Sequence, residues 1–178
     1  MPIKLNNATF NNGGTAKFNN TSLSAIRYGS TEVWKKQTTL YHYGDTGSSI
    51  TGGWTPTVTG TNAGSLASAS AAGTYLYTKA ENNTSAQFRT NRAIDLTPYK
   101  KLYFICTGNI SPTGWIAVFL DASDAWNASQ RYIIESSVSN YTGVWDISGI
   151  SGSHVVGVCA RTGWPGRSEI TWFSVTLE

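Results

Sequence analysis

The chain is poor in charged residues. Asp, Glu, Lys and Arg make up 13% of it, against roughly 25% in an average soluble protein. Long helices draw on Ala, Leu, Glu, Lys and Arg, so this scarcity argues against a helical fold. Ser, Thr, Asn and Gly instead account for 74 of the 178 residues, and aromatic residues for 12%. Because that many aromatic side chains can fill a core, disorder is excluded as well, and an all-β protein with polar turns is predicted.

Long apolar runs and clustered basic residues are also missing. No stretch approaches the about 20 apolar residues of a membrane-spanning helix, so no membrane partner is predicted. The N-terminus MPIKLNNATF lacks the apolar core of about 7–15 residues of a secretory signal. We expect either that a signal has been removed or that the protein leaves its cell by assembly into a particle. Basic residues pair only at Lys35-Lys36 and Lys100-Lys101, so no nucleic-acid partner is predicted.

Cysteine is rare, with Cys106 and Cys159 as the only two. Each lies in an apolar, strand-like run, KLYFICT and HVVGVCA. They are interpreted either as small buried hydrophobic residues or as a disulfide between paired strands. No CxxC pair or Cys/His cluster suggests a metal site.

The first 37 residues differ from the rest. They carry a net charge of +4, whereas residues 38–178 carry −1, and they hold too few apolar residues for an independent core. Residues 23–28 and 31–35 flank the turn Gly29-Ser30 and predict a β-hairpin, which is marginal alone. We predict a segment 1–37 for attachment and oligomerisation, containing this hairpin, and a β-sandwich domain over residues 38–178.

The main body is predicted to be built from strands separated by turn sequences. The predicted strands are 39–43, 74–79, 85–90, 101–107, 115–121, 131–136, 143–147, 153–160 and 169–177. Residues 55–73 are small and polar and are predicted to be a loop. Strands at this spacing favour an antiparallel sandwich over βαβ units.

Alternation within the strands predicts which faces are buried. In 169–177, Phe173, Val175 and Leu177 fall on one face and Ile170 and Trp172 on the other. Residues 101–107 are apolar on both faces, as in a central strand covered on both sides.

The segments AIDLTPYKKLYFI, WIAVFLD, DISGISGSHVVGVCA and SEITWFSVTLE together resemble a galactose-binding-like jelly roll, a fold that many carbohydrate-binding modules share. The similarity covers roughly residues 93–178. It implies a jelly-roll sandwich and a binding role, and it implies no particular ligand.

The segment AIRYGSTEVWKK resembles a hairpin of tail and other virion proteins of bacteriophages that infect Gram-positive hosts. In those proteins it joins an assembly region to a variable distal module. The resemblance implies that residues 1–37 contact other virion subunits and that the protein is a homo-oligomer, in such families a trimer.

Catalytic motifs are missing. His42 and His154 are the only histidines, and neither HExxH nor GxSxG occurs. Hydrolysis of a glycosidic bond needs two facing carboxyl groups, and Asp121 or Asp124 with Glu169 is the pair left open. Asp95 and Asp146 precede turns, where Asp commonly forms Asx-turns, and are predicted to do so.

The Asp121-Ala-Ser-Asp124 segment, followed by Asn127, offers oxygen ligands of the kind that calcium prefers. Jelly-roll modules often hold a structural calcium. The alternative is a polar turn between strands. No cofactor is predicted, and structural calcium is the one exception left open.

Tryptophan is unusually frequent, with seven residues. By alternation Trp115, Trp145 and Trp172 are predicted to be buried. Trp54, Trp126 and Trp164 fall in predicted loops, where each either packs as a lid or presents a flat face on which a sugar ring can stack. Polar residues that can bond hydroxyls flank two of these loops: Arg161 and Arg167 flank Trp164, and Asp124 and Asn127 flank Trp126. The predicted ligand-binding residues are Trp126, Trp164, Arg161, Arg167, Asp124 and Asn127.

Together these observations predict a non-enzymatic component of a phage virion, located in the virion or outside the cell, whose sandwich binds host-surface glycan or protein. The alternative is a carbohydrate-binding module of a bacterial extracellular protein. A small glycan hydrolase is the least favoured interpretation.

Overall fold

The computed structural model describes residues 4–5, 8–9, 17–18, 21–22, 25–28, 31–35, 38–42, 53–60, 62, 64, 67–72 and 75–178. Every element with described bounds is a β-strand. Within these residues, no helix is long and apolar enough to cross a membrane. The chain divides into two compact units, Thr39–Leu177 and Met1–Thr38, the latter grouped with Glu178.

The described residues of the N-terminal unit form six short strands. Four of them pair in chain order in one antiparallel sheet: β1 (Lys4–Leu5), β2 (Ala8–Thr9), β3 (Lys17–Phe18) and β4 (Thr21–Ser22). Strands β5 (Ala25–Tyr28) and β6 (Thr31–Lys35) form a separate antiparallel hairpin. The predicted hairpin is therefore confirmed, whereas the four two-residue strands before it were not predicted.

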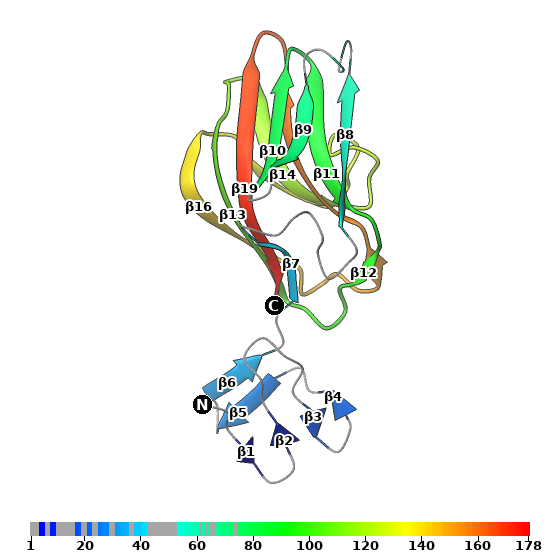
Figure 1. Ribbon diagram of the computed structural model, residues 1–178, viewed down its shortest axis with the longest axis vertical. Coiled ribbons are helices and arrows are strands. Elements are labelled where there is room, and N and C mark those ends of the chain that lie inside the picture. The colour runs from blue at the N-terminus through cyan, green and yellow to red at the C-terminus, as the bar shows by residue number, and fades with distance from the viewer. Residues whose placement is uncertain are drawn as a thin grey trace. The chain divides into compact units, whose positions relative to one another are not determined.

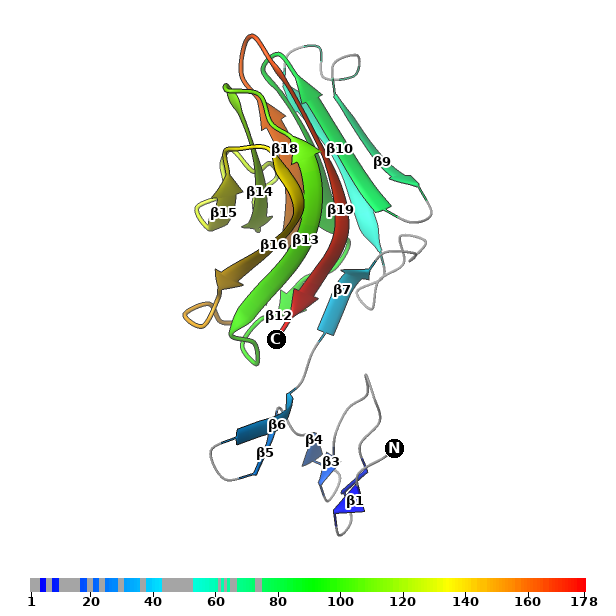
Figure 2. The ribbon, with the colours of Figure 1, turned by 90° about the vertical axis from the view of Figure 1, so that its left-hand side faces the viewer.

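The larger unit is a sandwich of two antiparallel sheets (Figures 1 and 2). The six-stranded sheet has the order β16 (Val138–Asp146), β13 (Lys101–Asn109), β19 (Arg167–Leu177), β10 (Tyr75–Glu81) and β9 (Ser68–Ala72), and β7 (Thr38–His42) also pairs with β19. The five-stranded sheet has the order β15 (Arg131–Ile134), β14 (Gly114–Leu120), β18 (Val156–Thr162), β11 (Thr84–Thr90) and β8 (Trp54–Gly60). Short strands β12 (Ile94–Asp95) and β17 (Ser153–His154) pair with each other.

This architecture confirms the predicted all-β jelly-roll sandwich, and each predicted strand of the body overlaps an observed one. The prediction of a loop over residues 55–73 is wrong, because β8 and β9 lie there. Strand β8 pairs with β11 along its whole length, and β9 pairs with β10 although it consists of Ser and Ala alone. Pairing with a neighbouring strand thus outweighs weak intrinsic strand preference.

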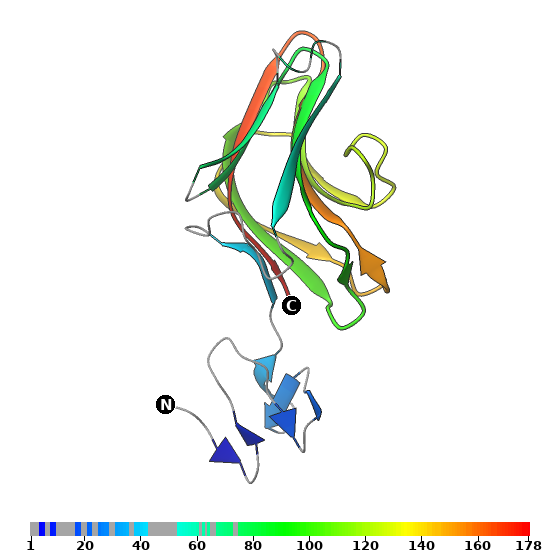
Figure 3. The same cartoon turned by 45° about the vertical axis from the view of Figure 1, so that its right-hand side comes forward.

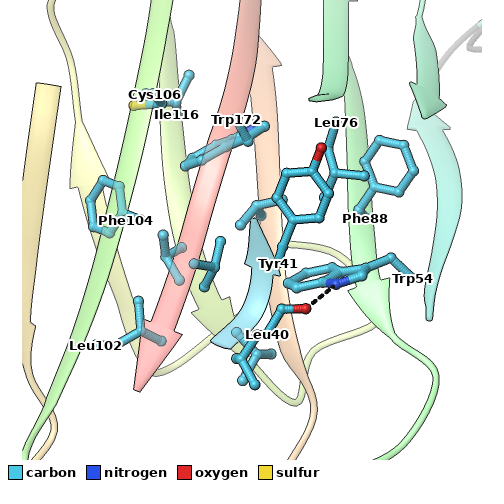
Figure 4. Close-up of a cluster of buried hydrophobic side chains, with 14 of the residues drawn as sticks. Leu40, Tyr41, Trp54, Leu76, Phe88, Leu102, Phe104, Cys106, Ile116 and Trp172 are labelled. Atoms are coloured by element: carbon cyan, nitrogen blue, oxygen red, sulfur yellow. Dashed lines mark hydrogen bonds between the residues drawn. The ribbon is translucent and has the colours of Figure 1, made fainter. Parts of the chain in front are cut away.

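Buried side chains from both sheets meet between the layers (Figure 4). Trp172 is fully buried, and its Nε1 donates a hydrogen bond to Thr78 Oγ1 at 3.3 Å. Trp54 is the first residue of β8, so its predicted place in a loop is wrong, and its side chain is only 8% exposed. Its Nε1 donates to the carbonyl of Leu40 at 3.0 Å, which ties strand β7 to the core.

A β-bulge in β19 changes which residues point inward. Ile105 of β13 pairs with Ser174, whereas Cys106 pairs with Trp172, so Phe173 is an extra residue. An extra residue shifts the alternation by one. Trp172 before the bulge and Val175 after it are therefore both buried. The predicted faces of 169–177 are wrong for this reason.

The predicted covering of β13 on both faces is also wrong. The strand is central, between β16 and β19, and Leu102, Phe104 and Cys106 are buried. On its outer face Tyr103 is half-buried and Ile105 is 37% exposed. A two-layer sandwich covers one face of each sheet.

The two cysteines are free and fully buried, on different sides of the five-stranded sheet. Cys106 packs in the core between the sheets, and Cys159 packs with Ala117 and Phe119 on the outer side. Burial raises the pKa of each thiol to about 12. The interpretation as small buried hydrophobic residues is confirmed, and the disulfide alternative is wrong.

Replacing Trp54→Phe should lower the free energy of unfolding by about 1–3 kcal/mol, because the buried carbonyl of Leu40 loses its donor. The matched control is Trp164→Phe at a side chain that is 68% exposed, where a change within about 0.5 kcal/mol is expected. Denaturant unfolding of both variants measures the difference. Equal stabilities would contradict the role assigned to the Trp54 hydrogen bond.

Candidate functional site

The outer face of the five-stranded sheet is organised in rows by the strand register. Because alternate residues of β14 such as Ile116 and Val118 point into the core, Trp115 points outward. Trp115 pairs with Arg161 of β18, Arg161 with Ser85 of β11, and Ser85 with Thr59 of β8. These four side chains form one row across the sheet, which we call the Trp115 row.

The loop after β14, residues 121–130, packs on the next row of that face. Ala125 and Ala128 of the loop are buried against Ala117 and Cys159. The fully buried Gln87 donates from Nε2 to the carbonyl of Ser123 in the same loop. Figure 3 shows this yellow-green loop on the outer side of the sheet. The loop is thereby fixed to the sheet, and Trp126 belongs to it.

Asp124 and Arg131 fix the conformation of this loop. Asp124 Oδ1 accepts hydrogen bonds from the backbone N–H of Trp126 at 2.9 Å and of Asn127 at 3.1 Å. Its Oδ2 accepts from Asn127 Nδ2 at 3.1 Å. Arg131 Nη1 donates to the carbonyls of Ala125 at 3.0 Å and Trp126 at 2.9 Å. The backbone on both sides of Trp126 is therefore held in place.

The indole of Trp126 joins the Trp115 row in a cluster of rings and cations. It stacks with Trp115 at 6.5 Å between centroids and an interplanar angle of 14°. Arg161 Cζ lies 3.7 Å from the ring centroid of Trp126 and 5.7 Å from that of Trp115. Arg131 Cζ also lies 5.7 Å from the ring centroid of Trp115. Trp126 nevertheless remains 57% exposed. The arrangement presents a partly exposed apolar ring with a guanidinium over one of its faces.

The pKa of Arg161 reflects the partial burial of its guanidinium. Desolvation lowers the pKa of the guanidinium, and the nearby charge of Arg131 acts in the same direction, while Asp124 raises it. Arginine stays protonated in proteins, so Arg161 keeps its charge. A guanidinium over an indole is a cation–π contact, which orients Arg161 relative to Trp126.

The predicted burial of Trp115 is wrong. Trp115 is half-buried on the outer face of the sheet. The prediction failed because the run WIAVFL is apolar at every position, which hides the alternation of inward and outward residues. Trp172 is buried as predicted, and Trp145 is half-buried against the core. Trp115 is thus a candidate site residue that sequence reasoning missed.

The structure brings together four of the six predicted ligand-binding residues, Trp126, Arg161, Asp124 and Asn127. It places Trp164 in the turn between β18 and β19, 68% exposed. Arg167 lies on the six-stranded sheet and contacts Glu169 at 2.8 Å and Glu81 at 3.7 Å. The chain crosses from one sheet to the other between residues 162 and 167, which separates Arg167 from Arg161.

The hydrolytic pair of Asp121 or Asp124 with Glu169 is not assembled. Asp121 and Asp124 lie in the loop on the five-stranded sheet. Glu169 lies in the six-stranded sheet, where it accepts a hydrogen bond from Tyr77 Oη at 2.7 Å. Those carboxyl groups therefore do not face each other across a cleft, as hydrolysis requires.

The carboxylates that were candidates for calcium bond protein N–H groups instead. Asp121 Oδ1 accepts from the Val155 N–H at 2.9 Å, and Oδ2 lies 2.6 Å from His154 Nδ1. No group of three or more His, Cys, Asp or Glu that could hold a metal occurs within the described ranges. Asp95 and Asp146 form Asx-turns, as predicted, accepting from the N–H of Thr97 and of Ser148.

Known proteins resemble this chain in fold alone. No protein-family model matches it, and no curated protein does so. Among solved structures, a Lys-to-Ala variant of a family 29 carbohydrate-binding module aligns with a TM-score of 0.54 at 12% identity, covering 80% of this chain and 91% of that one. Another variant, complexed with cellulohexaose, gives 0.54 at 12% identity over 80% and 89%. A third, complexed with mannohexaose, gives 0.53 at 11% over 80% and 90%.

The pair of His154 with Asp121 should make stability depend on pH. The hydrogen bond to Asp121 raises the pKa of His154. Burial raises the pKa of Asp121, but hydrogen bonds from His154 and Val155 outweigh it and leave that pKa lowered. The stabilisation is then full between the unfolded carboxyl and imidazole values of about 3.9 and 6.5. It is lost as the pH rises through the raised pKa of His154 or falls through the lowered pKa of Asp121.

Denaturant unfolding of the parent and of His154→Gln should therefore differ more at about pH 5.5 than at about pH 8.5. The difference should stay below about 1 kcal/mol, because the Asp121 side chain is 54% exposed and solvent screens the pair. A difference that is constant or larger at the higher pH would refute this account.

Proposed function

We propose that the unit Thr39–Leu177 is a non-catalytic carbohydrate-binding module acting outside the cell, and that it binds through Trp126 and the Trp115 row. The observation that carries this proposal is the exposed Trp126 ring, 57% accessible although the backbone on both sides of it is hydrogen-bonded. A large aromatic ring held rigidly at the surface loses little entropy on binding.

The chemistry of this surface suits a sugar. One side of a pyranose ring presents apolar C–H groups that pack on an indole, and its hydroxyls need hydrogen-bond partners at the edge of that ring. Arg161, which lies over the Trp126 ring, and Asn127 in the same loop as Trp126 supply donors next to that ring. Thr59 adds a partly exposed hydroxyl at the far end of the Trp115 row, whereas Ser85, between Arg161 and Thr59, is buried.

The comparisons support the proposal at the level of fold. The similar structures are family 29 carbohydrate-binding modules, and two of them are complexed with cellulohexaose and mannohexaose. A shared fold alone does not fix function, so the argument for this chain rests on the Trp126 surface.

Trp126→Ala should weaken glycan binding by about 1–3 kcal/mol, the range for truncating an aromatic anchor. Its melting temperature should hardly change, because the ring contributes little to the core. Trp164→Ala, at another exposed tryptophan, is the matched control and should leave the affinity unchanged. Titration calorimetry with cellulohexaose, mannohexaose and uronic-acid oligosaccharides measures both.

Loss of stability in Trp126→Ala without loss of affinity would instead make Trp126 a lid. An affinity lost only in Trp164→Ala would move the site to the turn between β18 and β19.

A second candidate function is that of a virion component, with residues 1–37 attached to other subunits and the protein a homotrimer. It is favoured by the β5–β6 hairpin, which forms in a compact unit separate from the sandwich. It also rests on the resemblance of AIRYGSTEVWKK to phage hairpins. None of the similar structures named above is a virion protein, so this candidate ranks behind the first.

Mass in solution discriminates the two candidates. The virion interpretation predicts an oligomer for the full chain and a folded monomer when residues 1–37 are removed, because a two-stranded hairpin needs a partner surface. Light scattering gives both masses, and circular dichroism checks that the shortened chain is folded. A strictly monomeric full chain would contradict the homotrimer.

A further inference from the structure

Arg161 differs from Arg131 and Arg167 in the contacts that its guanidinium makes. Arg131 donates to two backbone carbonyls of the loop 121–130, and Arg167 pairs with Glu169. Within the described part of the chain, Arg161 contacts the rings of Trp115 and Trp126 and bonds no carboxylate or carbonyl. None of its guanidinium nitrogens is both buried and without a partner, so its N–H donors reach solvent.

The carboxylate nearest to Arg161 in the loop does not serve as its counter-ion. Both oxygens of Asp124 accept hydrogen bonds from Trp126 and Asn127, and Asp124 contributes only a longer-range charge to Arg161. Asp121 is likewise engaged, by His154 and by the Val155 N–H. Arg161 is therefore a partly desolvated cation whose donors are free for an external partner.

We infer that the ligand is an acidic glycan whose carboxylate is bound by Arg161; this inference rests on the proposed function of the same surface. A planar guanidinium matches a carboxylate through two parallel hydrogen bonds, which are stronger than bonds to a neutral hydroxyl. A hydroxyl alone would leave the charge of Arg161 uncompensated as the ligand displaces water.

The position of Arg161 specifies where the acid stands in the sugar. Its Cζ lies over the Trp126 ring, 3.7 Å from the centroid, so a sugar that packs on the exposed part of this indole reaches Arg161 only with an acid carried on, or directly beside, the packed ring. Uronic acids meet this condition, because their carboxylate is attached to the pyranose ring itself. The neutral cellulohexaose and mannohexaose bound by the similar structures lack such a group.

The test compares acidic sugars with their neutral counterparts on the full chain. Oligomers of galacturonate, glucuronate and mannuronate are titrated calorimetrically, each beside its carboxyl-reduced form, which keeps the pyranose ring and removes the charge. We expect at least one acidic oligomer to bind about tenfold to a hundredfold more tightly than its reduced form. The advantage should shrink as salt is raised.

Substitutions on the protein assign the effect to Arg161. Arg161→Gln should abolish the preference for the acid. Arg161→Lys should keep only part of it, because Lys retains the positive charge and lacks the two parallel N–H donors of the planar guanidinium. Arg92→Gln is the matched control: it removes the same charge at an exposed turn residue just after β11. It should leave the preference intact. Melting temperatures verify that each variant is folded.

The outcomes separate the inference from the proposed function. If neutral oligomers bind through Trp126 and no acidic oligomer is preferred, the acidic ligand is refuted and glycan binding stands. Binding only to sulfated oligosaccharides would also refute the carboxylate. If neither acidic nor neutral oligomers bind, both proposals fail. An acid preference that survives in Arg161→Gln would place the recognition elsewhere.

Discussion

Burial of one face of the five-stranded sheet against the core determines which side chains lie on its outer face. Phe88, Ile116 and Val158 point into the core, so strict alternation places their neighbours on the opposite face. Antiparallel register then sets Trp115 beside Arg161. The loop that follows β14 packs on the same outer face and carries Trp126 to that row. The candidate site is thus a by-product of core packing, completed by one loop.

The fold was predictable from the sequence wherever apolar residues mark a strand. Strands β13, β14, β18 and β19 are rich in apolar and β-branched residues, and sequence reasoning found each of them. Strand β9 escaped prediction because Ser and Ala carry no hydrophobic pattern, and it exists through its pairing with β10. The bulge at Phe173 also escaped, because an extra residue depends on the partner strand β13 rather than on the local sequence.

The candidate site was predictable only in part, for topological reasons. Asp124, Trp126 and Asn127 are close in the chain, and one Asx-type turn keeps them together. Arg161 joins them because β18 pairs in register with β14, although the two strands are far apart in the chain. Its closeness in sequence to Trp164 had instead grouped Arg161 with that tryptophan. Trp115 was missed because an uninterrupted apolar run gives no sign of which side faces out. Distances across sheets are not encoded in local sequence, so the ring cluster required the structure.

The central claim, that sugar binds at Trp126 and the Trp115 row, is tested most directly by the indole N–H signals of the seven tryptophans. In a ¹H–¹⁵N NMR titration with oligosaccharide, the signals of Trp126 and Trp115 should move. The signals of Trp54 and Trp172 should stay, because both indoles are buried and hydrogen-bonded inside the protein. Binding that shifts Trp164 alone, or backbone signals of the six-stranded sheet around Tyr77, and leaves Trp126 unmoved would contradict the account.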